Sequence, residues 1–208
     1  MKKTIIPKIE FRYSEVYDRN YRESTDIKNI LKEKNQEYPS REEILEYIKK
    51  VKKLWEEQNE EILLEISNIS KFNWKEEKII CYVVGICRPF SEPLTMRTYG
   101  KNTNRFITTL IHELIHQIFT QNKKEYSRWN NFVLEKYEKE KRLTKNHILL
   151  SAIHWKILNK FFGKDSIKKE IKQLNHEEYK RAWEIVKKET PDKIIKKFYG
   201  IIENEKNN

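Results

Sequence analysis

Apolar and charged residues alternate in the first regular stretch of the chain, residues 4–13. The apolar positions are Ile9, Phe11 and Tyr13, and the charged positions are Lys8, Glu10 and Arg12. A period of two is typical of a strand with one buried face. We therefore predict a first strand over residues 4–13.

A helical period follows from residue 40, where Ser40 and Glu43 have the spacing of a capping box. Apolar residues then recur at spacings of three, four or seven positions: Ile44, Ile48, Val51, Trp55, Ile62, Ile66 and Ile69. This pattern predicts one long amphipathic helix, with Asn59 as the expected position of a break.

The middle of the chain is its most apolar part. Residues 78–87 are apolar at almost every position, which predicts a strand buried on both faces, and residues 94–99 predict a second, short strand. Two predicted helices, 105–119 and 144–163, are apolar around most of their circumference. Helices of this kind lie in the interior of a protein, so we expect both to be buried.

Amphipathic helices account for most of the remaining sequence. Residues 125–142 predict a surface helix, and capping signals at Ser166, Asn175 and Thr190 predict two or three further helices. The elements together predict an α+β fold that is mostly helical, with a small sheet packed on a buried helix.

The 208 residues of the chain suit one domain. We expect three parts within it. They are an N-terminal strand and helix over residues 1–77, a core over 78–163, and a C-terminal helical extension over 164–208.

Charge and composition narrow the class of protein. The net charge is +11, yet no apolar run approaches the ~20 residues that cross a bilayer. The N-terminus lacks the apolar stretch of a secretory signal, because Pro7 and charged residues interrupt it. We expect a cytoplasmic protein with no membrane-spanning segment, in which Cys81 and Cys87 are reduced core thiols.

The first buried helix contains His112, Glu113 and His116, which together form the pattern His-Glu-x-x-His. Histidines four positions apart lie on one face of a helix, so both imidazoles point at one cation, with the carboxylate beside them. Imidazole and carboxylate groups are costly to bury in an apolar helix without a partner. The pattern therefore predicts a metal site.

The other buried helix carries two candidates for a third ligand, His147 and His154. Seven residues of helix separate them by ~10 Å, so they do not both bind the same ion. We choose His147, near the start of the helix, with Ser151 one turn later as a hydrogen-bonding partner, and keep His154 as the reserve. If His147 binds the metal, His154 is either a donor to the reaction's oxyanion or a core residue.

The motif resembles that of the zincin metallopeptidases. The resemblance implies that His112 and His116 bind Zn²⁺ and that Glu113 takes a proton from zinc-bound water, so that a peptide or protein substrate is hydrolysed. The third ligand on a later helix is similar to the gluzincin layout, except that gluzincins use Glu where His147 stands here. In zincins an edge strand that pairs with substrate precedes the motif helix, and residues 94–99 occupy that place.

Several alternatives stay open at this point. The sequence does not single out the residue that would assist the metal as a further electrophile. The candidates are Arg97, Tyr99, Tyr126 and His154. The +11 charge raises a nucleic-acid-associated protein as a rival class, although the basic residues are interleaved with Glu along helices. A third reading is a structural zinc protein without catalysis. We expect His176 to be an exposed residue with no role.

Overall fold

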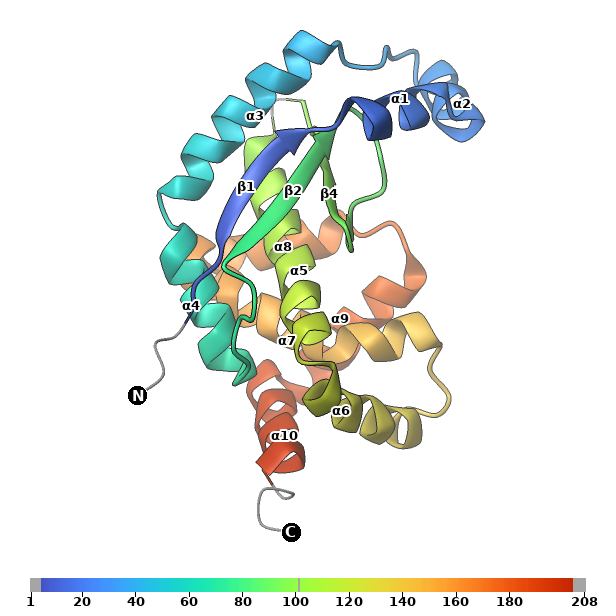
Figure 1. The fold of residues 1–208 in the computed structure, drawn as a ribbon. Helices are drawn as coiled ribbons and strands as arrows, with labels where there is room; N and C mark the ends of the chain where they lie inside the picture. The colour runs from blue at the N-terminus through green and yellow to red at the C-terminus, as the bar shows by residue number, and fades with distance from the viewer. Residues whose placement is uncertain (1–4, 101, 204–208) are drawn as a thin grey trace. The chain divides into compact units, whose positions relative to one another are not determined.

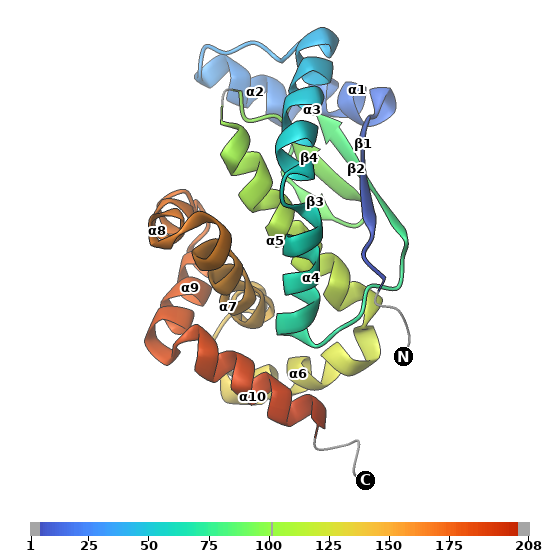
Figure 2. The ribbon, with the colours of Figure 1, turned by 90° about the vertical axis from the view of Figure 1, so that its left-hand side faces the viewer.

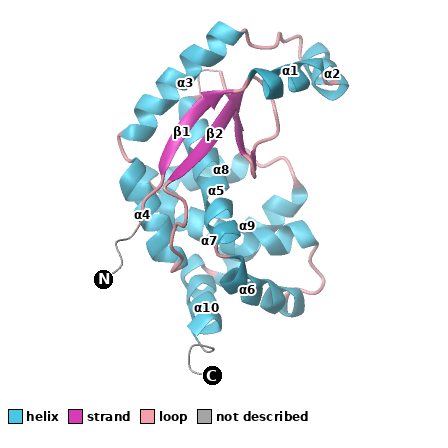
Figure 3. Ribbon diagram, in the orientation of Figure 1, coloured by secondary structure: helices cyan, strands magenta, loops and turns pink. Residues whose placement is uncertain are grey.

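The computed structural model describes residues 5–100 and 102–203, which form ten helices and four strands. The fold is α+β and mostly helical, as predicted (Figure 3). The described residues divide into two compact units, 5–61 with 76–114 and 62–75 with 115–203. Helix α5 (Thr103–Gln121) contributes to both units. The expectation of one domain over 1–208 stays a prediction.

A four-stranded mixed sheet forms the centre of the first unit (Figure 1). It contains β1 (Lys8–Tyr13), β2 (Lys78–Val84), β3 (Phe90–Ser91) and β4 (Leu94–Arg97), in the order β1-β2-β4-β3. β2 runs parallel to both β1 and β4, whereas β3 pairs antiparallel with β4. The sheet therefore has β1 at one edge and the two-residue β3 at the other.

The strands differ from the sequence prediction in their bounds and in their burial. β2 ends at Val84 rather than residue 87, and β4 ends at Arg97 rather than residue 99. β1 begins at Lys8 rather than residue 4, which lies outside the described residues. β2 is buried at alternate positions, while Tyr82 on its other face is only partly buried and packs edge-on against Tyr17 at 5.2 Å. The expectation of a strand buried on both faces is wrong at Ile80 and Tyr82, which are only partly buried.

Helices α1 (Glu15–Glu23) and α2 (Thr25–Glu33) follow β1 and were not predicted. Helix α3 (Arg41–Glu56) begins with the predicted capping box. Glu43 N donates to Ser40 Oγ at 3.1 Å, and Ser40 N donates to Glu43 Oε2 at 2.7 Å. α3 packs against β1 and β2, and the chain breaks before α4 (Asn59–Ser70), which confirms the expected break.

The second unit is built around α7 (Arg142–Phe162), which packs against α6, α8, α9 and α10 (Figure 2). Their bounds are Lys123–Lys136 for α6, Lys164–Lys172 for α8, Glu177–Glu189 for α9 and Pro191–Glu203 for α10. Leu158, Ile167 and Trp183 form a buried cluster that joins α7 to α8 and α9. α7 ends at Gly163, whose positive φ of 75° fits the predicted glycine stop.

Helix α6 ends at Lys136, six residues before the predicted end at Arg142. Three helices follow α7, which is the upper number predicted. Within residues 5–100 and 102–203, no helix is both long and apolar enough to cross a membrane.

Candidate metal centre

Helix α5 places two of the predicted ligands. Its apolar positions Leu110, Ile111 and Leu114 are fully buried, so the helix is held in the interior as its sequence predicts. His112 and His116 lie one turn apart on this helix, and both are partly buried. Their imidazoles therefore share one face of α5.

Helix α7 supplies the third imidazole, from His147 in its second turn. Among the described residues, His112, His116 and His147 form one group whose potential ligand atoms all lie within 4.8 Å of one another. The Nε2 atoms of His116 and His147 are 3.2 Å apart. A tetrahedral zinc ion with bonds of ~2.0–2.1 Å holds its nitrogen ligands roughly 3.3 Å apart, so this separation fits a shared cation.

The ring of His147 is oriented by two contacts. Its Nδ1 lies 2.8 Å from the backbone carbonyl oxygen of Leu143, one turn earlier on α7. With the hydrogen on Nδ1, the ring donates to that carbonyl and leaves the lone pair of Nε2 for a cation. The ring of Tyr179, from α9, packs against His147 with centroids 4.5 Å apart.

His116 is held in the form that binds metals. Burial, and to a smaller extent the neighbouring His147, lower the pKa of its imidazole to about 3. His116 is therefore neutral near pH 7. A metal ligand must be the neutral imidazole, so the ring needs no deprotonation before it binds.

Glu113 is 7% exposed, on the turn of α5 that carries His112. Burial raises the pKa of its carboxyl to about 8, and the positive charge of Arg88 opposes this rise. A buried carboxyl with a pKa near neutrality is suited to exchanging protons with a substrate. Three imidazoles around one point can hold a divalent cation, and Glu113, which follows His112 in the chain, can move a proton. No known family model, curated protein or solved structure matches this chain.

The structure brings together His112, His116 and His147, and it places the reserve ligand His154 elsewhere on α7. His154 is fully buried, and its ring lies 5.9 Å from that of Trp183. It is not part of the three-histidine group. Its surroundings fit the core role that the sequence left open.

Of two smaller expectations, one turns out differently and the other, the exposure of His176, is confirmed. The partner of His147 Nδ1 is the carbonyl of Leu143 rather than the hydroxyl of Ser151, although Ser151 is buried on the same helix. His176 is exposed as expected, but its ring lies 5.6 Å from that of Tyr179.

The prediction of β4 as the edge strand is wrong, because β3 pairs with it through Phe90 with Thr95 and Ser91 with Leu94. The two segments form a tight hairpin that no local pattern predicted. An extended peptide therefore does not meet a free edge along the first half of β4.

The candidate electrophiles have other neighbours. The guanidinium groups of Arg97 and Arg105 lie 5.3 and 4.9 Å from the centre of the Tyr99 ring. Tyr126 stacks on Phe119 with centroids 4.2 Å apart. These contacts do not single out one of the candidates as the electrophile.

Sequence reasoning missed three groups around the centre: the Leu143 carbonyl, Tyr179 and Arg88. The carbonyl was foreseeable, since it lies one helical turn before His147. Tyr179 and Arg88 have no signal in the sequence, because their positions depend on how α9 packs on α7 and how the chain leaves β2.

Proposed function

We propose that this protein is a zinc-dependent metallopeptidase in which His112, His116 and His147 hold Zn²⁺ and Glu113 is the catalytic base. The observation that supports it most directly is the 3.2 Å separation of the Nε2 atoms of His116 and His147, on different helices. The donor set of three neutral imidazoles suits zinc, and three protein ligands leave a fourth position for water or substrate. When bound, zinc supplies Lewis acidity that activates water and polarises a carbonyl group.

Glu113 performs the proton transfers in this proposal. Its carboxylate accepts a proton from water as the water oxygen forms a bond to the carbonyl carbon of the peptide. The same carboxyl then delivers the proton to the nitrogen as the carbon–nitrogen bond breaks, so that the leaving group departs as a neutral amine. The pKa of Glu113 falls when positive charge is added nearby, which returns the carboxyl to its basic form.

The contacts of His147 support the ligand assignment. The Leu143 carbonyl and the Tyr179 ring fix the imidazole before any cation arrives. A pre-oriented ligand loses less freedom on binding. His154 lies instead in the core beside Trp183, outside the three-histidine group.

The test is metal analysis and peptide hydrolysis on protein purified without added metal. Wild type is expected to carry about one zinc ion per chain. Glu113→Gln is expected to keep the zinc and lose hydrolysis by roughly 10²–10⁴-fold, the usual contribution of a general base. Glu135→Gln, an exposed position on α6, is the matched control and is expected to behave as wild type.

The histidine variants separate the two ligand choices. His147→Ala is expected to lose zinc, and His154→Ala to keep it while circular dichroism reports the fold. Loss of zinc from His154→Ala but not from His147→Ala would instead identify His154 as the third ligand. Equal hydrolysis by wild type and Glu113→Gln would refute the base, and zinc without hydrolysis of any peptide would identify a structural zinc protein.

A further inference from the structure

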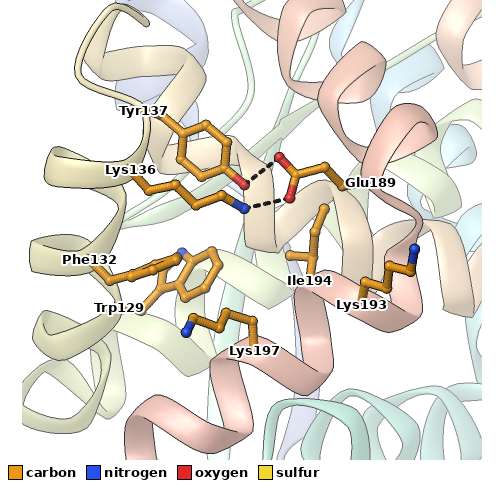
Figure 4. A pocket seen from close by; sticks show the side chains of 8 residues that line it. All are labelled: Trp129, Phe132, Lys136, Tyr137, Glu189, Lys193, Ile194 and Lys197. Atoms are coloured by element: carbon orange, nitrogen blue, oxygen red, sulfur yellow. Dashed lines mark hydrogen bonds and ion pairs between the residues drawn. The ribbon is translucent and has the colours of Figure 1, made fainter.

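A second candidate site lies in the second unit, among residues that the metallopeptidase proposal does not use. It is a cavity of about 370 Å³ that opens between α6, α10 and the end of α9 (Figure 4). Ligand sites for small molecules fall in this range of volume. We call it the lysine–aromatic cavity, lined by Trp129, Phe132, Lys136, Tyr137, Glu189, Lys193, Ile194 and Lys197.

The lining has an excess of positive charge. Its one carboxylate, Glu189, is already used, since Lys136 Nζ lies 2.5 Å from one oxygen and Tyr137 donates to the other at 3.0 Å. Lys193 and Lys197 are exposed, and no carboxylate of the described residues lies within ion-pair distance of either. Two ammonium groups are therefore available to an anion.

The other wall is aromatic. Phe132 is partly exposed, and its ring lies 5.3 Å from that of Trp129, which is buried and packs in turn on Phe198 at 5.9 Å. Phe132 is thus backed by a fixed aromatic layer. The ammonium of Lys197 lies 5.2 Å from the centre of the Phe132 ring.

The view in Figure 4 places Lys197 beside the two rings and Lys193 on the far side of Ile194. The two lysines are four residues apart on α10, so they stand one helical turn from each other. One ammonium group beside an aromatic face, with a second one a turn away on the same helix (Figure 4), is a combination that suits a nucleotide. The rings stack on bases, and the ammonium groups meet phosphates.

We propose that the lysine–aromatic cavity binds a nucleotide, with its base against Phe132 and its phosphate held by Lys193 and Lys197. Inorganic phosphate alone would leave the aromatic wall unused, and an apolar ligand would leave the two ammonium groups unpaired. The nucleotide is either free or one unit of a single-stranded nucleic acid, since both present the same base and phosphate. The overall charge of +11 favours the approach of either.

The experiment measures fluorescence anisotropy of a labelled oligothymidylate of about eight nucleotides at several salt concentrations. The wild-type protein is expected to bind it with an affinity that falls as salt rises. Lys193→Ala/Lys197→Ala is expected to bind at least roughly tenfold more weakly, with a salt slope smaller by about 0.7, the contribution of one single-strand phosphate contact. Phe132→Leu is expected to lose roughly tenfold in affinity with the slope unchanged.

The matched control is Lys49→Ala/Lys53→Ala, which removes two exposed lysines with the same spacing from α3. It is expected to stay within about twofold of wild type, because diffuse charge adds little to a specific contact. Thermal melts confirm that each variant is folded.

Competition distinguishes the two sources of the nucleotide. Displacement by thymidine monophosphate identifies a site for a free nucleotide, and binding of the oligomer without such displacement identifies a site for a strand. The proposal is overturned if nothing binds, if both double-lysine variants lose affinity equally, or if Phe132→Leu has no effect. It is also overturned if inorganic phosphate or polyglutamate displaces the oligomer as well as a nucleotide does.

Discussion

Glu113 gives the metal-free protein a stability that depends on pH. Burial raises the pKa of its carboxyl from 4.5 to about 8, so the folded chain holds this proton more tightly than the unfolded chain between these pH values. The resulting stabilisation is fully present below pH 4.5 and is lost as the pH rises towards 8. Its size is at most roughly 5 kcal/mol, from 1.36 kcal/mol per pKa unit.

We therefore expect Glu113→Gln to gain stability relative to wild type as the pH rises from about 4.5 to 8. Urea unfolding of chelator-treated protein at several pH values measures this difference. The lowered pKa of His116 has the opposite effect, since it makes the folded chain more stable as the pH rises from about 3 to 6.5. This contribution is the same in wild type and Glu113→Gln, so it cancels from the difference between them. Glu135→Gln is the control. The prediction would be contradicted if the difference in free energy of unfolding between Glu113→Gln and wild type did not change with pH.

At the scale of elements, one buried carboxylate connects α1, the loop before α3 and the end of β2. Asp18 on α1 is 1% exposed. It accepts hydrogen bonds from Tyr13 at 3.0 Å, Tyr38 at 2.7 Å, Arg22 at 3.0 Å and the backbone N–H of Gly85 at 2.8 Å. A buried carboxylate with four donors is well satisfied, so these segments are held in a fixed arrangement.

Gly85 allows this arrangement because it has no side chain. A Cβ atom at this position would lie 2.8 Å from Tyr38 Cζ, and closer still to Cε1. Gly85→Ala is therefore expected to displace Tyr38 from Asp18 and to lower the free energy of unfolding by about 1–3 kcal/mol. Gly200→Ala is the control, because a Cβ there meets nothing within 4 Å and alanine favours the helix α10.

Urea unfolding of the two variants compares a crowded glycine with an open one. Gly200→Ala is expected to be unchanged or more stable by up to about 1 kcal/mol. Equal stability of Gly85→Ala and Gly200→Ala would show that Tyr38 moves without cost.

Local signals in the sequence made some of the helices predictable and not others. The start of α3 at Ser40 and the end of α7 at Gly163 follow from local signals, a capping box and a residue that tolerates positive φ. Helices α1 and α2 carry a short apolar stripe that the sequence analysis missed, such as Ile27, Ile30 and Leu31 in α2, although Asp18 is the one buried residue of the two helices. Each of these helices is only nine residues long, which is shorter than the window over which a helical period is read with ease.

The residues of the metal centre also differ in how far the sequence alone could place them. His112, Glu113 and His116 are related by the geometry of one helix, so the sequence alone predicted that they lie together. His147 and His154 lie on the same face of α7, and the sequence offered only an argument of position for choosing between them. The separation of His116 from His147 depends on how two helices pack, which is a property of tertiary structure. The parallel pairing of β1 with β2 is non-local for the same reason, whereas the β3–β4 hairpin is a local contact.

At the scale of the whole molecule, metal binding is expected to raise thermal stability. His116 and His147 come from different helices, so a cation that needs both binds the folded chain and not the unfolded one. Zinc at about one hundred times its dissociation constant adds about 2.7 kcal/mol to the free energy of unfolding. For a chain of this length the melting temperature is expected to rise by roughly 5–10 °C.

Differential scanning calorimetry of chelator-treated protein, with and without zinc, measures this rise. Because the described chain forms two compact units, two transitions are a natural outcome, and the shift is expected in the one that includes α7. His116→Ala is expected to abolish the shift while leaving the metal-free transition near its wild-type temperature. His176→Ala, which removes an exposed histidine outside the three-histidine group, is expected to retain it. An equal shift in wild type and His116→Ala would mean that zinc binds elsewhere on the folded chain, and the three-histidine assignment would fail.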